Sequence, residues 1–111
     1  MTDPKPLFFG LYEQACVGNG SGAVSLWTHP DDRRLGALDL RYWIDLARRA
    51  EEAEFDLFFF GDVLGMYDTL GGGPATALEW GVELPAHDPL LHIPALAAVT
   101  ERIAFGATVS T

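Results

Sequence analysis

The last residues of the chain constrain its fold more than any other segment. Residues Ala98 to Thr111 read AVTERIAFGATVST, which is a helix tail, the charged pair Glu101-Arg102 and then an apolar run of the β type. A run that is apolar on both faces is typical of a strand inside a parallel sheet, where helices cover the faces. The run therefore predicts an α/β fold in which further chain follows this strand.

The first half of the chain predicts a strand, a helix and a second strand. Residues 7–12 form a short apolar run. Asp39 stands where a helix N-cap belongs, because apolar side chains follow it at helical spacing over residues 40–50. The aromatic run Phe55 to Phe60 is too short for a helix and predicts a strand that ends at Gly61-Asp62.

Two long loops and a second helix complete the predicted order. Residues 14–36 and 63–87 carry no regular apolar period, and long loops in compact domains are commonly functional. Asp88-Pro89 joins an N-cap residue to a proline at the first helical position, which predicts a helix to about Arg102, interrupted by Pro94. The order strand, loop, helix, strand, loop, helix, strand predicts a parallel α/β sheet with right-handed crossovers.

The charge distribution argues against a nucleic-acid partner. The net charge is −9, and residues 51–111 hold ten acidic side chains but a single basic one, Arg102. Phosphate binding needs clusters of Lys and Arg, whereas the only arginine pairs here are Arg33-Arg34 and Arg48-Arg49. Both pairs are interpreted as solvated surface.

The numbers and positions of cysteine and histidine argue against disulfides and metal sites. The single cysteine, Cys16, excludes an internal disulfide and a multi-cysteine zinc site, and it favours a reducing compartment. His29, His87 and His92 are not at metal-ligand spacing, so no metal site is expected. No apolar stretch approaches the ~20 residues of a membrane span and no signal peptide is recognised. The sequence predicts a cytoplasmic protein.

Three polar residues follow or end the predicted strands. Asp62 stands at the carboxyl end of the second strand, the edge at which parallel α/β folds bind ligands. The alternative is an aspartate that starts a loop and bonds its own backbone. Thr108 and Ser110 are expected one pleat apart in the last strand, on one face. Their hydroxyls bind either a polar ligand or neighbouring backbone.

Cys16 follows the first strand, at the same edge as Asp62. A lone cysteine is more often a small buried hydrophobe than a nucleophile. Tyr67 and Glu83 fall in the second loop, where packing and solvation are the ordinary roles.

Four segments together carry a resemblance to a known family. They are CVGN (Cys16 to Asn19), WTHP (Trp27 to Pro30), FDLFFFGDVLGMYD (Phe55 to Asp68) and DPLLHIPALAAVTERIAFGATVST (Asp88 to Thr111). In this order they resemble the N-terminal part of the bacterial-luciferase-like flavin-dependent monooxygenases. The similarity is strongest to the branch of nitrilotriacetate monooxygenase component A, dibenzothiophene-sulfone monooxygenase and long-chain alkane monooxygenase.

This resemblance implies a fold and an activity. Residues 1–111 would be the N-terminal part of a (β/α)₈ TIM barrel, contributing its first three strands and two helices. A separate NAD(P)H-dependent flavin reductase would supply reduced FMN, and O₂ would be the co-substrate. The implied chemistry is that of a flavin C4a-peroxide, which oxygenates a small organic substrate. A homo-oligomer is also expected.

The resemblance also assigns roles to single residues. Asp62 matches the family's acidic residue beside the flavin, and Thr108 matches a threonine that faces the flavin ring. Cys16 and Tyr67 match residues on the substrate side, and they are the candidate catalytic residues.

Three positions depart from the alkane-oxidising branch. Asn19 replaces a His, Glu83 replaces a Gln, and Thr28 stands where many members have Arg. These departures argue against an alkane substrate and leave the flavin chemistry untouched.

Two alternatives to the monooxygenase remain open. One is a non-catalytic α/β binding or assembly domain, since three parallel strands leave two open edges and an uncovered apolar face. The other is a deazaflavin-dependent oxidoreductase of the same superfamily.

Overall fold

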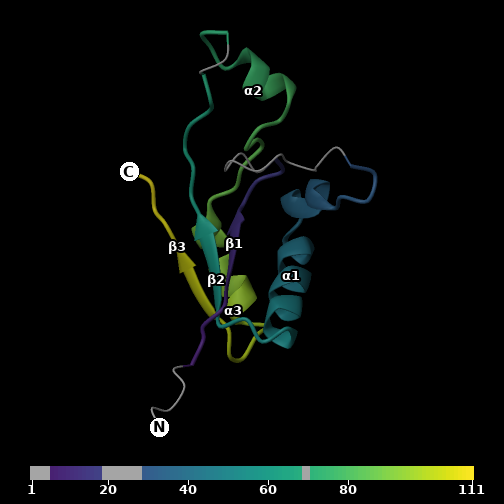
Figure 1. Ribbon diagram of the computed structural model, residues 1–111, viewed down its shortest axis with the longest axis vertical. Coiled ribbons are helices and arrows are strands. Elements are labelled where there is room, and N and C mark those ends of the chain that lie inside the picture. Colours follow the sequence, from purple (N-terminus) through teal and green to yellow (C-terminus); the bar gives the residue numbers. More distant parts are fainter. Residues whose placement is uncertain (1–5, 19–28, 69–70) are drawn as a thin grey trace.

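The computed structural model describes a three-stranded parallel sheet with helices packed on one face (Figure 1). The described residues are 6–18, 29–68 and 71–111. The strand order is β1-β2-β3, so each new strand adds beside the last. The strands are β1 (Gly10–Gln14), β2 (Leu57–Gly61) and β3 (Ala104–Ala107). The parallel α/β class expected from the sequence is confirmed.

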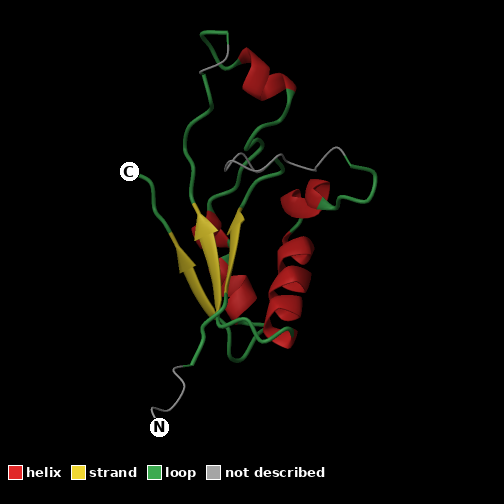
Figure 2. Cartoon of the chain, in the orientation of Figure 1, coloured by secondary structure: helices red, strands yellow, loops and turns green. Residues whose placement is uncertain are grey.

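The helical elements lie between the strands (Figure 2). They are η1 (Arg34–Leu38), α1 (Leu40–Glu52), α2 (Ala75–Glu79), η2 (Pro89–Leu91) and α3 (Ile93–Ala97). Asp39 caps α1 as expected, because its carboxylate accepts the Arg41 backbone N–H at 2.9 Å. Asp88 caps η2 in the same way, through the Leu90 N–H.

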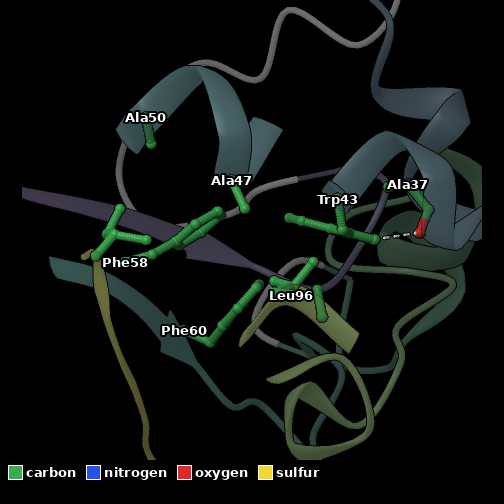
Figure 3. Packing of buried hydrophobic residues seen from close by; sticks show 9 residues of the cluster. Ala37, Trp43, Ala47, Ala50, Phe58, Phe60 and Leu96 are labelled. Carbon is green, nitrogen blue, oxygen red and sulfur yellow. Dashed lines mark hydrogen bonds between the residues drawn. The ribbon is translucent and has the colours of Figure 1, made fainter. Parts of the chain in front are cut away.

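One buried cluster joins α1 and α3 to the sheet (Figure 3). Trp43, Phe58, Phe60 and Leu96 are fully buried in it. The rings of Phe58 and Phe60 stack with centroids 4.7 Å apart, and Trp43 meets the Phe60 ring edge-on at 5.4 Å. The alternation along β2 therefore turns two of its aromatic rings toward the helices.

The opposite face of the sheet carries smaller side chains and one aromatic pair. Tyr12 of β1 stacks on Phe59 of β2 with ring centroids 6.2 Å apart, and Tyr12 remains 47% exposed. The Tyr12 ring lies over Gly61, since a Cβ there would be only 2.9 Å from Cζ of Tyr12. The uncovered face expected from three strands is present.

Two strand boundaries differ from those predicted. The first strand spans Gly10–Gln14 rather than residues 7–12, and Leu7, Phe8 and Phe9 are exposed. Pairing starts late because the Phe9 backbone is bound to Asp56: its N–H donates to the Asp56 carboxylate at 2.9 Å and its carbonyl accepts the Asp56 N–H. The last strand ends at Ala107, so Thr108 and Ser110 lie just beyond it.

The helix predicted from Asp88 to about Arg102 is wrong in length. It is divided into η2 and α3, and Pro94, which has no N–H, stands at the start of α3. Beyond α3, the Glu51 carboxylate accepts the backbone N–H groups of Glu101, Arg102 and Ile103, at 2.8, 2.6 and 3.0 Å, and so binds the link between α3 and β3 to α1. Residues 63–87, expected to be a loop, contain the short helix α2.

We expect Glu51→Ala to lower the thermal unfolding temperature of the protein more than Glu52→Ala. The three N–H groups hold the pKa of the Glu51 carboxyl below its ordinary value. The stabilisation is therefore complete above the unfolded pKa of about 4.3 and is lost as the pH falls through the lower folded value. Unfolding scans between pH 3 and 7 should show the two variants converging at the acidic end. A constant difference across this range would contradict the role of the carboxylate.

Candidate active site

Polar side chains from two neighbouring strand ends meet at the carboxyl edge of the sheet. Thr108 continues the ladder beyond β3, since its N–H donates to the Phe60 carbonyl at 3.0 Å. Its Oγ1 accepts the backbone N–H of Asp62 at 2.7 Å. Ser110 donates its N–H to Asp62 Oδ2 at 2.8 Å and its hydroxyl to the Asp62 carbonyl at 3.1 Å. The structure thus brings together Asp62, Thr108 and Ser110.

These contacts bind both hydroxyls to the backbone of Asp62 and still leave polar groups for a ligand. Because Thr108 Oγ1 is the acceptor of its bond, the hydroxyl hydrogen remains able to donate. Only Oδ2 of Asp62 accepts a hydrogen bond among the described residues, so Oδ1 remains an acceptor. The strand ends therefore present one donor and one acceptor.

A cleft of about 330 Å³ lies beside this group. The loop after β2 forms one wall with apolar side chains, and the segment before η2 forms another. Its lining residues include Asp62, Val63, Leu64, Met66, His87, Leu90, Thr108 and Ser110. The cleft is large enough for a sizeable part of a small-molecule ligand.

A second polar cluster is buried next to it, at the end of β1. Gln14, Cys16 and Glu83 are 4%, 3% and 4% exposed. Oε1 of Glu83 accepts from the Gln14 side-chain amide at 3.3 Å and from the Tyr67 hydroxyl at 3.5 Å. A small cavity is lined by Gln14, Cys16 and Glu83 together with Asp62, so the two polar groups adjoin.

Backbone pairing between two distant segments places Glu83. Its N–H donates to the Gly18 carbonyl, Val17 donates to Pro85 at 3.3 Å, and His87 donates to Ala15 at 2.7 Å. Glu83 itself has φ +56°, an uncommon conformation for a residue with a side chain. The segment is therefore folded onto the end of β1, and Glu83 is buried rather than solvated as expected for a loop residue.

Sequence reasoning missed Gln14, which it placed at the start of a loop. It is the last residue of β1 and is paired in register with Gly61. The rule that identified Asp62, namely a polar side chain at the carboxyl end of a strand, applies equally to Gln14. Asn19 and Thr28, the two departures in the first loop, lie outside the described residues.

The environment of Cys16 keeps its thiol protonated. Burial, and then the negative charge of Glu83, raise the pKa of Cys16 to about 11. The sulfur contacts the Gly18 carbonyl oxygen at 3.5 Å. At neutral pH the side chain is thus a neutral thiol, not the thiolate that nucleophilic catalysis requires.

The described residues contain no cluster of three or more His, Cys, Asp or Glu able to hold a metal ion. His87 and His92 stack with ring centroids 5.5 Å apart, and His92 is buried against Trp43. Burial lowers the pKa of His92. No helix of the described ranges is long and apolar enough to span a membrane.

Comparison with known proteins identifies the family. Residues 21–111 match the family model of the luciferase-like monooxygenases. The chain belongs to this family. Its luciferase-like relatives include long-chain alkane monooxygenase of Geobacillus thermodenitrificans (strain NG80-2), 40% identical over 107 residues, and dimethyl-sulfide monooxygenase of Hyphomicrobium sulfonivorans, 36% identical over 104 residues. These alignments cover 96% and 94% of this chain and 24% and 21% of the relatives.

Solved structures of the family agree with the fold. The crystal structure of long-chain alkane monooxygenase superimposes with a TM-score of 0.88 at 38% identity, covering 96% of this chain and 24% of that one. Riboflavin lyase, solved with modified FMN and riboflavin, superimposes with a TM-score of 0.83 at 35% identity and covers 96% of this chain and 23% of that one. The three strands and their helices are part of the (β/α)₈ TIM barrel of these enzymes. The chain spans about a quarter of the length of the relatives it matches.

Proposed function

We propose that the complete protein is a two-component monooxygenase that uses reduced FMN and O₂ to oxygenate a small organic substrate. The observation that supports this proposal is the Asp62–Thr108–Ser110 group beside its cleft at the carboxyl edge of the sheet. That edge is where barrel enzymes bind their ligands. Membership of the luciferase-like family supports the same reaction class.

The residues present fit a flavin. The pyrimidine edge of the flavin ring offers carbonyl acceptors and an N–H donor. The Thr108 hydroxyl can donate to such a carbonyl, and Asp62 Oδ1 can accept such an N–H. Bound reduced flavin would supply the electrons for oxygen activation, and the protein would supply binding and orientation.

The remaining tasks fall to residues around the cleft. Val63, Leu64, Met66 and Leu90 give it apolar walls, which in the complete barrel would help to exclude water from the reacting groups. We place Cys16 and Tyr67 on the substrate side, because both adjoin Glu83 in the buried cluster beside the cleft. The neutral Cys16 thiol would act there by packing and weak hydrogen bonding.

The proposed reaction needs a partner that delivers reduced FMN. We assign that role to a separate NAD(P)H-dependent flavin reductase, by similarity to the two-component relatives. A homo-oligomer, and a location in the cytoplasm, remain predictions of the sequence.

Anaerobic titration of the complete protein with reduced FMN tests the proposal. We expect saturable binding, slower reoxidation of the bound flavin than of free reduced FMN, and incorporation of one atom of labelled O₂ into an organic substrate. Binding of a reduced deazaflavin in place of reduced FMN would favour the deazaflavin alternative. Failure to bind either flavin would contradict a flavin enzyme and favour a binding domain.

We expect Cys16→Ala to impair substrate oxygenation while leaving the affinity for reduced FMN unchanged within about twofold. The sulfur lies in the Glu83 cluster, and its loss removes a contact on the substrate side. A lost contact of about 1.4 kcal/mol would lower kcat/KM about tenfold. Cys16→Ser is the matched control, because it retains a small hydrogen-bonding side chain. A larger effect on FMN binding than on oxygenation would contradict this placement.

A further inference from the structure

Within the described ranges, no positive side chain pairs with the buried carboxylate of Glu83. Its side chain is 4% exposed, yet no arginine of the described residues forms an ion pair with it. Its two donors are neutral, and both bonds go to Oε1, at the long distances of 3.3 and 3.5 Å. Among the described residues nothing donates to Oε2. Burying an ionised carboxylate in this way is costly unless a cation or strong donor reaches it.

The neighbouring Gln14 adds a second acceptor without a donor. Its side-chain amide group donates to Glu83, so its own oxygen, Oε1, faces away from the carboxylate. That oxygen is buried and has no hydrogen-bond partner in the described part of the chain. Turning the amide around would place this oxygen against the negative Glu83, which is unfavourable. The orientation is therefore fixed by Glu83, and the orphaned acceptor is a consequence of it.

Open space adjoins the Glu83 carboxylate, whereas Gln14 lines a cavity of only about 10 Å³. A cleft of about 200 Å³ is lined by Tyr67 and Glu83 together with Val63, Gly65 and Met66. Glu83 gives this cleft a carboxylate and Tyr67 gives it a hydroxyl, and the rest of its lining is mostly apolar. A ligand with a small alkyl or aryl body and one strongly donating end matches that division.

The negative, hydrogen-bond-accepting character of Glu83 favours some classes of ligand over others. A carboxylate or phosphate would be repelled by Glu83, and a hydroxyl brings a single donor and no charge. The described residues also lack a third ligand for a metal ion. A protonated amine has up to three N–H donors and a positive charge, so it can both donate to Glu83 and balance its charge.

We propose that Glu83 binds the protonated amino group of the substrate, so that the enzyme acts on a small organic amine. This inference rests on the proposed monooxygenase function and names its substrate class. Tyr67 positions Glu83 through its hydroxyl. Glu83 sets the preference for a cation, and Gln14 supports Glu83 from the buried side through its amide N–H group.

Calorimetric titration of the complete protein with three ligands of matched length tests the proposal. The probes are pentylamine, pentanol and pentanoate, each added with and without saturating FMN. We expect pentylamine to bind at least about tenfold more tightly than pentanol, since a charge-assisted bond replaces a neutral one, and pentanoate to bind weakest. Equal binding of amine and alcohol, or a preference for pentanoate, would overturn the inference.

Glu83→Gln keeps the shape of the side chain and removes its charge, so the amine preference should fall to about twofold or less. Glu79→Gln, on the exposed surface of α2, is the matched control and should retain the full preference. Gln14→Met keeps the charge of Glu83 and should lose only part of the preference. These titrations measure only the binding of the amine, the alcohol and the acid. A missing amine preference would therefore overturn the substrate class without contradicting the monooxygenase function, which is tested by reduced-FMN binding and oxygenation.

Discussion

Replacing Trp43 with alanine is expected to destabilise the fold by about 3–5 kcal/mol. The side chain is 0% exposed and touches both helices and sheet: its ring meets Phe60 at 5.4 Å and His92 at 5.5 Å. Its indole N–H also donates to the Ala37 carbonyl at 2.8 Å. Alanine would leave a cavity and an unpaired carbonyl at the buried Ala37 of η1.

Urea unfolding of the complete protein, followed by circular dichroism, measures this effect. Trp80→Ala is the matched control, since Trp80 is 58% exposed and its loss should change the unfolding free energy by less than about 0.5 kcal/mol. Trp43→Phe keeps an aromatic ring and removes the hydrogen bond, so its cost should fall between the two. Equal stability of the two alanine variants would show that α1 is not held to the sheet through Trp43.

The architecture could be predicted because it depends on local patterns. Asp39 as the cap of α1, and the short aromatic run of β2, follow from residues close together in the sequence. The place of Asp62 at the carboxyl edge could be predicted too, because parallel strands end at one edge, whereas its hydrogen bond with Thr108 was not predicted.

The features that could not be predicted depend on contacts between distant residues. The link between α3 and β3 is held by Glu51, some fifty positions earlier in the chain, and no local pattern indicates this contact. Glu83 is buried because its segment pairs with residues 15–18. A loop composition suggests solvent for such a residue, whereas the tertiary fold determines its burial. The Gln14–Glu83 pair therefore emerged only from the structure.

The second large effect is expected at Asp62. Asp62→Ala removes Oδ1, the acceptor proposed for the flavin, and also Oδ2, which holds the Ser110 N–H at 2.8 Å. A hydrogen bond to a charged group contributes about 1.5–3 kcal/mol, so the affinity for reduced FMN should fall by roughly tenfold to a hundredfold. Anaerobic fluorescence titration of the complete protein measures this change.

Two further variants separate a lost flavin contact from a loosened strand end. Asp68→Ala removes an exposed carboxylate later in the same loop and should leave FMN affinity unchanged. Ser110→Ala keeps the carboxylate of Asp62 and removes the hydroxyl that bonds to the Asp62 carbonyl, so it tests the local structure alone. If Ser110→Ala weakened reduced-FMN binding as much as Asp62→Ala, Asp62 would act by holding the strand ends together. A large effect of Asp62→Ala alone would identify its carboxylate as the group that meets the flavin.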